Sequence, residues 1–287
     1  MSTSAEFPKN ENTYFIDTES GAEMARLLDQ DRLYTRGMGG LFAELSDLSG
    51  VNRVLDIACG PGGWIQEVAF AHPEIEAVGI DISETMIAYA NAQVSVQKLD
   101  NARFLVMDAT QPLDFPDHSF DLVNARLLQG FMPVTAWPTL LQECKRITRA
   151  GGIIRFTETE AGATTSPALE KLWDMLIQSV QRAGHTILPT GRMLGSTPML
   201  CRFLREAGYQ NVQLTAHALE YSHGTEFHYG FYQDWKVAFK LLQPYLISQA
   251  VTTQEEVNQL YEQMVREMLM TDFYGVYFLC TATGERP

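Results

Sequence analysis

A glycine-rich turn between an apolar run and a helix-forming segment is the strongest chemical signal in the sequence. Residues 54–64 read VLDIACGPGGW. Gly60 and Gly62 remove side chains where a bulky ligand must approach the backbone, and Asp56 can accept hydrogen bonds from an ammonium group or a water. A tight strand-to-helix turn without a ligand can have the same pattern. The turn therefore needs support from other residues.

Acidic residues follow the next two predicted strands, each one strand-helix repeat further along the chain. Asp81 follows the apolar run 77–80, and Asp108 follows the run 104–107. Because parallel strands open on one sheet edge, both carboxylates should lie beside the glycine turn. The first can accept hydrogen bonds from two ribose hydroxyls, and the second from an adenine amino group. One strand-end carboxylate is commonly just solvated, but three beside this turn predict a nucleoside site.

Two other kinds of nucleotide site fit the sequence less well. The dinucleotide fingerprint G-x-G-x-x-G would place its third glycine at Ile65, so the helix packing that this glycine permits is lost. No phosphate loop of the G-x-x-x-x-G-K-[ST] type is present in the sequence. A cofactor without a pyrophosphate agrees better with the acidic surroundings.

The elements that must position these residues alternate between strand and helix. Short apolar runs predict parallel strands buried on both faces, and they lie at 54–57, 77–80, 104–107, 122–123 and 153–156. Helical stretches lie between them, at 64–71, 84–94 and 137–148, which predicts a doubly wound sheet. Ser20 and Glu23 have capping-box spacing for a helix from about Gly21. A second helix is expected to carry Leu41, Phe42, Leu45 and Leu48.

The alternation stops after Glu160, where helical patterns take over. Ser166 with Pro167, and later Thr197 with Pro198, have the composition of helix starts. The helical segment between a strand at 212–214 and the terminal run 276–283 is too long for a loop, so it predicts a cap. We therefore divide the chain into an N-terminal helical lid segment (1–49), a core (50–160), a helical insertion with a connecting helix (161–208), the last core strands (209–215 and 276–287) and a helical cap over an acceptor pocket (216–275).

Several motifs together resemble one enzyme family. DIACGPG at 56–62 resembles the nucleoside-binding first motif of class I S-adenosylmethionine-dependent methyltransferases, with Ala58 in place of the more frequent glycine. GIDIS at 79–83 is similar to the ribose motif of that family, and DA at 108–109 to its adenine motif. Segments 115–123 and 149–152 are similar to those preceding its fourth and fifth strands. The resemblance implies an α/β fold with a doubly wound, mainly parallel seven-stranded sheet, an antiparallel last strand and helical cap insertions.

The resemblance also implies S-adenosyl-L-methionine as cofactor and S-adenosyl-L-homocysteine as product. Gly60 and Gly62 would border the methionine part, and Asp81 would hold the ribose. Asp108 and Ala109 would border the adenine, whereas Asn124 to Arg126 would lie beneath the sulfonium. The residues expected to bind the cofactor through the motifs are Asp56, Ala58, Gly60, Gly62, Asp81, Ile82, Asp108, Ala109, Asn124 and Arg126.

Residues outside the motifs are expected to complete the site. Tyr14 and Arg36 precede the first strand and are predicted to close over the amino-acid end of the cofactor, where Arg36 could pair with its carboxylate. Alignment of donor and acceptor supplies most of the rate of a methyl transfer, and a base is needed only when the acceptor must lose a proton. We single out Glu158 and His228 as candidates for that base, although a solvated or core histidine is the commoner situation. The sequence leaves open Glu160, His185, His217 and His223.

The composition limits the partners. The formal net charge of −14 disfavours nucleic acid as a substrate, and the four scattered cysteines predict neither a disulfide framework nor a metal site. The start of the chain has no targeting pattern, and no apolar run is long enough for a membrane span, so a cytoplasmic protein is expected. The oligomeric state stays open, a homodimer included.

Three functions are compatible with these observations. A transferase that methylates O, N or C of a small molecule is favoured, because an inserted cap encloses a compact acceptor. A macromolecule methyltransferase would need an exposed channel, which the charge balance disfavours. A protein that binds the cofactor without transferring its methyl group, as a sensor or a rearrangement catalyst, would have the same binding motifs.

Overall fold

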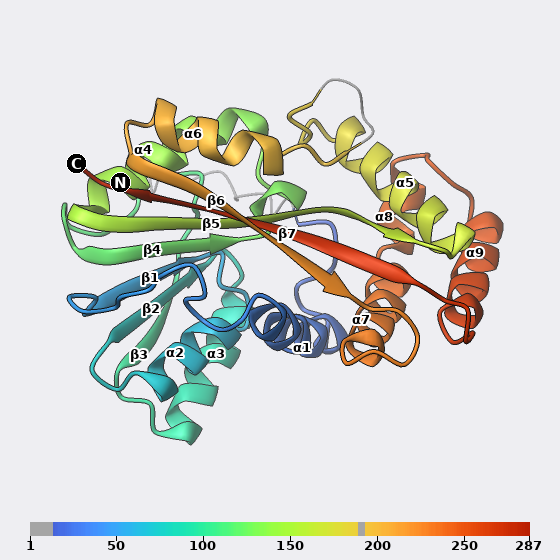
Figure 1. The fold of residues 1–287 in the computed structure, drawn as a ribbon, viewed down its shortest axis with the longest axis horizontal. Coiled ribbons are helices and arrows are strands. Elements are labelled where there is room, and N and C mark those ends of the chain that lie inside the picture. The colour runs from blue at the N-terminus through green and yellow to red at the C-terminus, as the bar shows by residue number, and fades with distance from the viewer. Residues whose placement is uncertain (1–13, 189–192) are drawn as a thin grey trace, which may run out of the picture.

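The structure is a computed structural model that describes residues 14–188 and 193–287. These residues form a seven-stranded sheet in the order β3-β2-β1-β4-β5-β7-β6 (Figure 1). β7 runs antiparallel to both of its neighbours, and the other adjacent strands pair in parallel. The predicted fold class is therefore confirmed. The strands are β1 (Arg53–Ile57), β2 (Glu76–Asp81), β3 (Ala102–Val106), β4 (Phe120–Arg126), β5 (Thr148–Thr164), β6 (Gln210–Glu220) and β7 (Gly275–Glu285).

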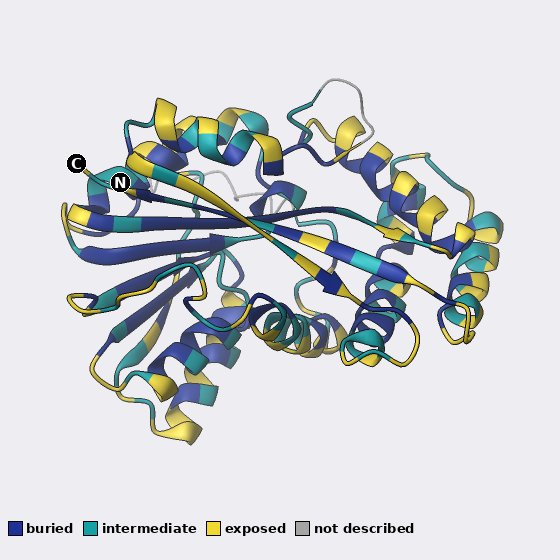
Figure 2. Cartoon of the chain, in the orientation of Figure 1, coloured by how far each residue is buried: buried dark blue, intermediate teal, exposed yellow. Residues whose placement is uncertain are grey.

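Helices cover both faces of the sheet. Because side chains alternate along a strand, Leu55 and Ile57 of β1 pack with α4 (Trp137–Ile147) and α6 (Leu200–Glu206). Val54 packs on the opposite face with α2 (Gly63–Ala71) and α3 (Glu84–Gln97). Figure 2 shows the result, with buried central strands and a largely exposed edge strand β6. Packing on both faces fixes the parallel strands, so their carboxyl ends lie together at one edge of the sheet.

The helix α1 (Gly21–Gly37) begins at the predicted cap, where Ser20 Oγ accepts the backbone N–H of Glu23 at 3.4 Å. The second helix that was expected to carry Leu41, Phe42, Leu45 and Leu48 does not form, and residues 38–50 are turns and bends. Gly39 and Gly40 have φ values of +98° and +127°, which end the helical path. Leu41 O instead accepts the indole N–H of Trp64. The apolar spacing reflects a loop that packs on α2.

Two strands extend further than the sequence pattern predicts. β7 pairs along its whole length, so Thr164 is opposite Gly275 on one side and Glu220 is opposite Val276 on the other. The predicted domain boundaries at 160/161 and 215/216 therefore cut through β5 and β6 and are corrected here. Residues 157–164 read TETEAGAT, which contains no apolar run. Backbone pairing with β7, rather than apolar side chains, makes this segment a strand.

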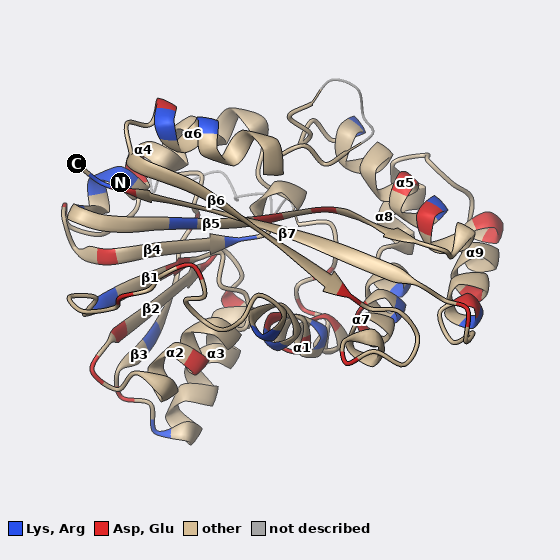
Figure 3. Ribbon diagram, viewed as in Figure 1, with Lys and Arg blue, Asp and Glu red and all other residues tan. Residues whose placement is uncertain are grey.

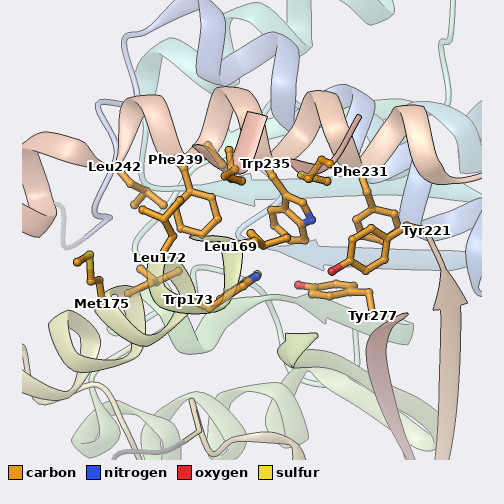
Figure 4. Packing of buried hydrophobic residues seen from close by; sticks show 14 of the residues in the cluster. Leu169, Leu172, Trp173, Met175, Tyr221, Phe231, Trp235, Phe239, Leu242 and Tyr277 are labelled. Atoms are coloured by element: carbon orange, nitrogen blue, oxygen red, sulfur yellow. The ribbon is translucent and has the colours of Figure 1, made fainter. Parts of the chain in front are cut away.

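The cap consists of helices packed around a second core (Figure 4), and it lies at one end of the sheet (Figure 1). Ser166 and Thr253 cap α5 and α9 through their hydroxyls, as predicted. α1 packs against α7, which joins the lid segment to the cap. The cap helices are α5 (Pro167–Arg182), α7 (His228–Leu241), α8 (Gln243–Ser248) and α9 (Gln254–Glu267), and the short 3-10 turns are η1 (Leu128–Gly130), η2 (Val134–Ala136) and η3 (Thr197–Met199).

Charged residues are spread over helices, loops and strands, and β1 to β5 each carry some of them (Figure 3). Within residues 14–188 and 193–287, no helix combines the length and the hydropathy of a membrane span.

Candidate active site

One cavity of about 560 Å³ extends from the carboxyl ends of the parallel strands into the cap. Its walls come from both the core and the cap, with α1 and residues 14–18 on the lid side. Of the predicted site residues, the cavity is lined by Tyr14, Asp56, Ala58, Gly60, Asp81, Ile82, Asp108, Ala109, Arg126 and Glu158. Gly62, Asn124, Arg36 and His228 are not part of its wall.

The glycine turn forms the floor of the core half of the cavity. Ala58 and Gly60 have left-handed backbone conformations, with φ of 55° and 54°. Ala58 thus adopts a conformation that favours glycine, the residue usual at this point of the related motif. A Cβ on Gly60 would meet only Leu27, at 3.8 Å. The backbone of Gly60 is therefore accessible from the cavity.

Gly62 has a packing role that the sequence did not indicate. It caps α2 with φ of 81°, and a Cβ at this position would lie 2.4 Å from the ring of Phe104. Close packing between the turn and β3 therefore explains this glycine. Gly62 is not part of the cavity wall, and its contact with a ligand stays a prediction.

Asp81 connects the ends of two strands. Its Oδ2 accepts the N–H of Gly60 and its Oδ1 accepts the N–H of Ser83, both at 2.9 Å. Burial raises the pKa of this carboxyl. The backbone N–H of Ile82 also interacts with this carboxyl, which still keeps a lone pair for a ligand hydroxyl. Asp108 occupies the corresponding place after β3, where its Oδ1 accepts the N–H and the hydroxyl of Thr110, both at 2.8 Å.

Asp56 belongs to a buried polar row that crosses the sheet. Asn124 Nδ2 donates to Asp56 Oδ1 at 2.7 Å, and Arg155 Nη1 donates to Asn124 Oδ1 at 2.7 Å. Arg155 Nε donates to Glu44 Oε2 at 2.8 Å, and the other oxygen of Glu44 is 3.0 Å from His217 Nε2. Burial raises the pKa of Asp56 to about 7. Asn124 therefore acts behind the cavity wall, through Asp56, rather than on it.

Arg126 at the end of β4 is held by α1. Its guanidinium is ion-paired with Asp31 and donates to Thr35 Oγ1 at 3.1 Å. Asp31 also lines the cavity, yet no motif in the sequence identifies it. Its spacing of four residues from Thr35 on a helix is typical of any polar helix face.

Glu158 lies where the core half of the cavity meets the cap half. Its Oε1 accepts the N–H of Leu128 at 2.8 Å, and its Oε2 accepts that of Gln129 at 3.4 Å. Burial raises the pKa of Glu158 to about 8, and the nearby charge of Glu160 adds to this effect. A carboxyl with such a pKa can give or take a proton near neutral pH. Glu160 instead accepts backbone N–H groups of Leu194 and Gly195.

A buried charge cluster joins the lid to the cap. Arg26 Nη1 donates to Asp234 Oδ1 at 2.7 Å, and Arg26 Nε donates to Glu23 Oε2 at 2.7 Å. The hydroxyl of Tyr14 donates to Glu23 Oε1 at 2.6 Å. Tyr14 and Arg26 both line the cavity. The sequence pattern indicated Tyr14 but missed Arg26, because its partner Asp234 is far away in the chain.

Two residues that were predicted for the site lie outside the cavity wall. Arg36 is ion-paired with Glu226 on the surface and lies over the ring of Phe227, so the prediction that it closes over the cofactor is wrong for this structure. The ring of His228 is 2.7 Å from Met268 O, where it links α7 to the end of α9. None of the histidines in residues 14–188 and 193–287 lines the cavity. His228 is therefore not carried into the proposal as a base.

Comparison with known proteins agrees with this geometry. Residues 54–152 match the family model described as a methyltransferase domain. A demethylmenaquinone methyltransferase of Geobacillus kaustophilus is 37% identical over 108 residues, which cover 37% of this chain and 45% of the relative. The UbiE C-methyltransferase of ubiquinone and menaquinone biosynthesis from Dinoroseobacter shibae is 34% identical over 124 residues, 43% of this chain and 48% of the relative. The chain thus spans about half the length of these relatives.

Solved structures share the fold at low sequence identity. Phosphoethanolamine N-methyltransferase 2 of Haemonchus contortus, in complex with S-adenosyl-L-methionine, superposes with a TM-score of 0.57 at 18% identity, covering 98% of this chain and 61% of that one. The [4+2]-cyclase SpnF gives a TM-score of 0.52 at 19% identity, covering 94% and 97%. The core of this chain thus matches a methyltransferase domain over residues 54–152, and the chain shares its fold with these solved structures. S-adenosyl-L-methionine is the molecule bound in the Haemonchus contortus structure.

The residues of the cavity fit S-adenosyl-L-methionine as a cofactor. The carboxylates Asp31, Asp56, Asp81 and Asp108 line the cavity, and an acidic wall would favour the positive sulfonium and ammonium groups of this molecule. The raised pKa values of Asp56 and Asp81 reflect burial that a bound cation would offset. The open wall beside Gly60 accommodates a ligand against the backbone.

Proposed function

We propose that this protein transfers the methyl group of S-adenosylmethionine to O, N or C of a small-molecule acceptor. One observation carries the proposal: a single cavity is lined by the strand-end carboxylates of the core and also by the cap helices. Donor and acceptor would then share one chamber. A concave chamber of this size favours a small acceptor over a macromolecule.

The cofactor would be held by residues of successive strand ends. Asp81 would accept the ribose hydroxyls and, with Ile82, border the sugar. Asp108 and Ala109 would border the adenine. Ala58 and Gly60 would lie along the methionine part, and Asp56 would face its ammonium group directly or through a water. Arg126 and Tyr14 would complete the walls. The support for these roles is that all of these residues line one cavity.

The bound cofactor would supply a methyl group on a positive sulfonium, which reacts readily with a well-aligned lone pair. The protein would mainly bind both molecules, orient them and exclude water. Glu158 is the residue that we propose to accept a proton from a protic acceptor, because its buried carboxyl borders the cavity. Its pKa of about 8 means that ionised Glu158 becomes available as the pH rises through that value.

Methyl-labelled S-adenosylmethionine with a panel of small phenols, amines and enols tests the activity. Label in an extractable product, with S-adenosylhomocysteine formed in equal amount, is the expected result. Calorimetry with S-adenosylhomocysteine tests the cofactor site separately. No cofactor binding at millimolar concentration would overturn the proposal. Cofactor binding with conversion of an acceptor but no transferred label would instead favour the alternative of a rearrangement catalyst.

The remaining expectations complete the proposal. We also expect a cytoplasmic location. The net charge of −14 argues against nucleic acid as the acceptor. Label incorporated into nucleic acid or protein extracts, at a higher rate than into small molecules, would favour the macromolecule alternative.

A further inference from the structure

The cap half of the cavity has a chemistry of its own. Its wall is apolar and rich in aromatic rings from two facing helices and one strand (Figure 4). α5 contributes Trp173 and Leu176, α7 contributes Trp235, Ala238 and Phe239, and β7 contributes Tyr277.

Mutual packing fixes these rings. Trp173 and Trp235 are in edge contact, with centroids 5.0 Å apart and planes at 81°. Trp173 meets Phe239 in the same way, at 5.8 Å and 89°. The hydroxyl of Tyr277 is engaged with Tyr34 and Thr159, so its ring belongs to the apolar wall. A wall whose rings are already ordered binds a flat apolar ligand with little loss of side-chain entropy.

The positive charges of the cavity wall are already paired, so an anionic acceptor would find no unpaired cation among the described residues. Among the residues that the structure describes, the arginines and lysines in the cavity wall are Arg26 and Arg126. Arg26 is paired with Glu23 and Asp234, and Arg126 with Asp31. An acceptor that carries a phosphate or carboxylate would have to compete with these buried ion pairs.

Polar groups beside the apolar wall could form hydrogen bonds with a hydroxyl group on the ligand. Glu158 borders the cavity close to Thr157 and Thr159. The indole nitrogens of Trp173 and Trp235 have no hydrogen-bond partner in the described part of the chain. Both nitrogens have almost no accessible surface, so the carboxyl of Glu158 is the group in this part of the wall that can accept a hydrogen bond from a ligand hydroxyl.

From these observations we infer that the acceptor is an uncharged, mainly apolar ring compound with a hydroxyl or enol oxygen. Its ring lies against Trp173, Trp235 and Phe239, and its oxygen lies toward Glu158. When the oxygen is methylated, its proton passes to Glu158 as the new C–O bond forms and the S–CH₃ bond breaks. This inference rests on the proposed function, since it assumes that the core half of the cavity holds the cofactor.

Three probes with one ring and different charges test the inference. 2-Naphthol, 2-naphthoate and 2-naphthyltrimethylammonium are titrated into the protein saturated with S-adenosylhomocysteine. We expect 2-naphthol to bind at least about tenfold more tightly than either ion. Equal or tighter binding of the anion would show a free cation in the chamber. Equal or tighter binding of the ammonium would show an aromatic cage for cations. Either result overturns the inference.

A matched pair of variants locates the binding. Ala238→Phe fills the chamber and should weaken 2-naphthol binding about tenfold or more, with S-adenosylhomocysteine affinity within about twofold of wild type. Val237→Phe is the control, because it introduces the same side chain next to Ala238 at a position outside the cavity wall. If circular dichroism shows that Ala238→Phe does not fold, Leu176→Phe replaces it. Unchanged 2-naphthol binding in the folded variant overturns the inference, whereas wild type that fails to bind S-adenosylhomocysteine refutes the proposed function instead.

Discussion

Asn124 Nδ2 donates a hydrogen bond to Asp56 Oδ1 over 2.7 Å, deep beneath the cavity. Arg155, on the side of Asn124 away from Asp56, fixes the orientation of this amide. Because a guanidinium only donates hydrogen bonds, Arg155 Nη1 requires the oxygen of Asn124 on its side and so turns the amide nitrogen toward Asp56. The carboxyl of Asp56 is thereby held at the cavity wall in one orientation.

Asp56→Asn should stabilise the ligand-free protein above neutral pH. The folded-state pKa of Asp56 is raised to about 7, above the unfolded value of about 3.9. The contribution of the neutral carboxyl to the free energy of unfolding is therefore fully present below about pH 4. It is lost as the pH rises through 7, because ionisation is then costly in the folded state. Asparagine can accept the bond from Asn124 without ionising. We expect a higher melting temperature than wild type at pH 8 and little difference at pH 4, measured by calorimetry.

The same variant should bind S-adenosylmethionine more weakly, because it lacks the negative charge that faces a cation. Asp114→Asn, in an exposed loop, is the control and should change neither property. An Asp56→Asn variant with lower stability than wild type at pH 8 would contradict the burial argument.

Asp81→Ala should weaken S-adenosylhomocysteine binding by about 1–3 kcal/mol, because the ligand hydroxyls would lose a buried acceptor. Asp81→Asn keeps one acceptor oxygen and should lie between wild type and alanine. Isothermal titration calorimetry measures both. Affinity unchanged by either substitution would remove Asp81 from the cofactor site.

Glu158→Gln should flatten the pH dependence of methyl transfer to a hydroxyl acceptor. In wild type the rate should rise through about pH 8, the pKa of this buried carboxyl. The loss of a general base lowers kcat by about 10²- to 10⁴-fold. Glu160→Gln is the matched control: Glu160 anchors residues 194–195, so its loss should lower stability and leave the shape of the profile intact. A wild-type rise that persists in Glu158→Gln would exclude this role.

Two substitutions in the glycine turn should have opposite effects. Gly62→Ala places a Cβ against Phe104 at a φ of +81°, so we expect a loss of roughly 1–3 kcal/mol in unfolding free energy. Ala58→Gly relieves a left-handed alanine at φ 55° and should gain up to about 1 kcal/mol. Urea unfolding measures both. A neutral Gly62→Ala would mean that the ring of Phe104 can move.

Asp234→Ala should loosen the lid from the cap. Removing one partner of a buried ion pair costs about 3–5 kcal/mol, and both Arg26 and Asp234 are almost fully buried. Asp29→Ala removes the exposed partner of Arg32 and should cost no more than about 1 kcal/mol. Urea unfolding compares the two. Equal effects would show that the buried contact contributes little to the attachment of α1 to α7.

The core and the strand-end residues that line the cavity were predictable because their signals are local. An apolar run followed by a glycine turn or an acidic residue is contiguous in sequence, and parallel βα repeats bring the strand ends to one edge of the sheet. Asp56, Asp81 and Asp108 therefore reach the same cavity as predicted. The short acidic stretch around Glu158 was also found at the exit of a strand.

The misplaced and missed residues depend on contacts between distant segments. Arg36 is drawn to Glu226 and His228 to Met268 O, partners that no spacing in the sequence identifies. Asp31 and Asp234 have the pattern of ordinary polar residues on helices, yet packing of α1 against strand ends and cap buries them.

By itself, the sequence determined the parallel core, the glycine turn and the row of carboxylates, since each follows from residues adjacent in the chain. Only the tertiary structure decided which face of α1 closes the cavity, that Gly62 makes room for Phe104, and that Trp173 and Trp235 meet across the chamber. Those outcomes depend on how separate elements pack, and packing is a property of the whole fold.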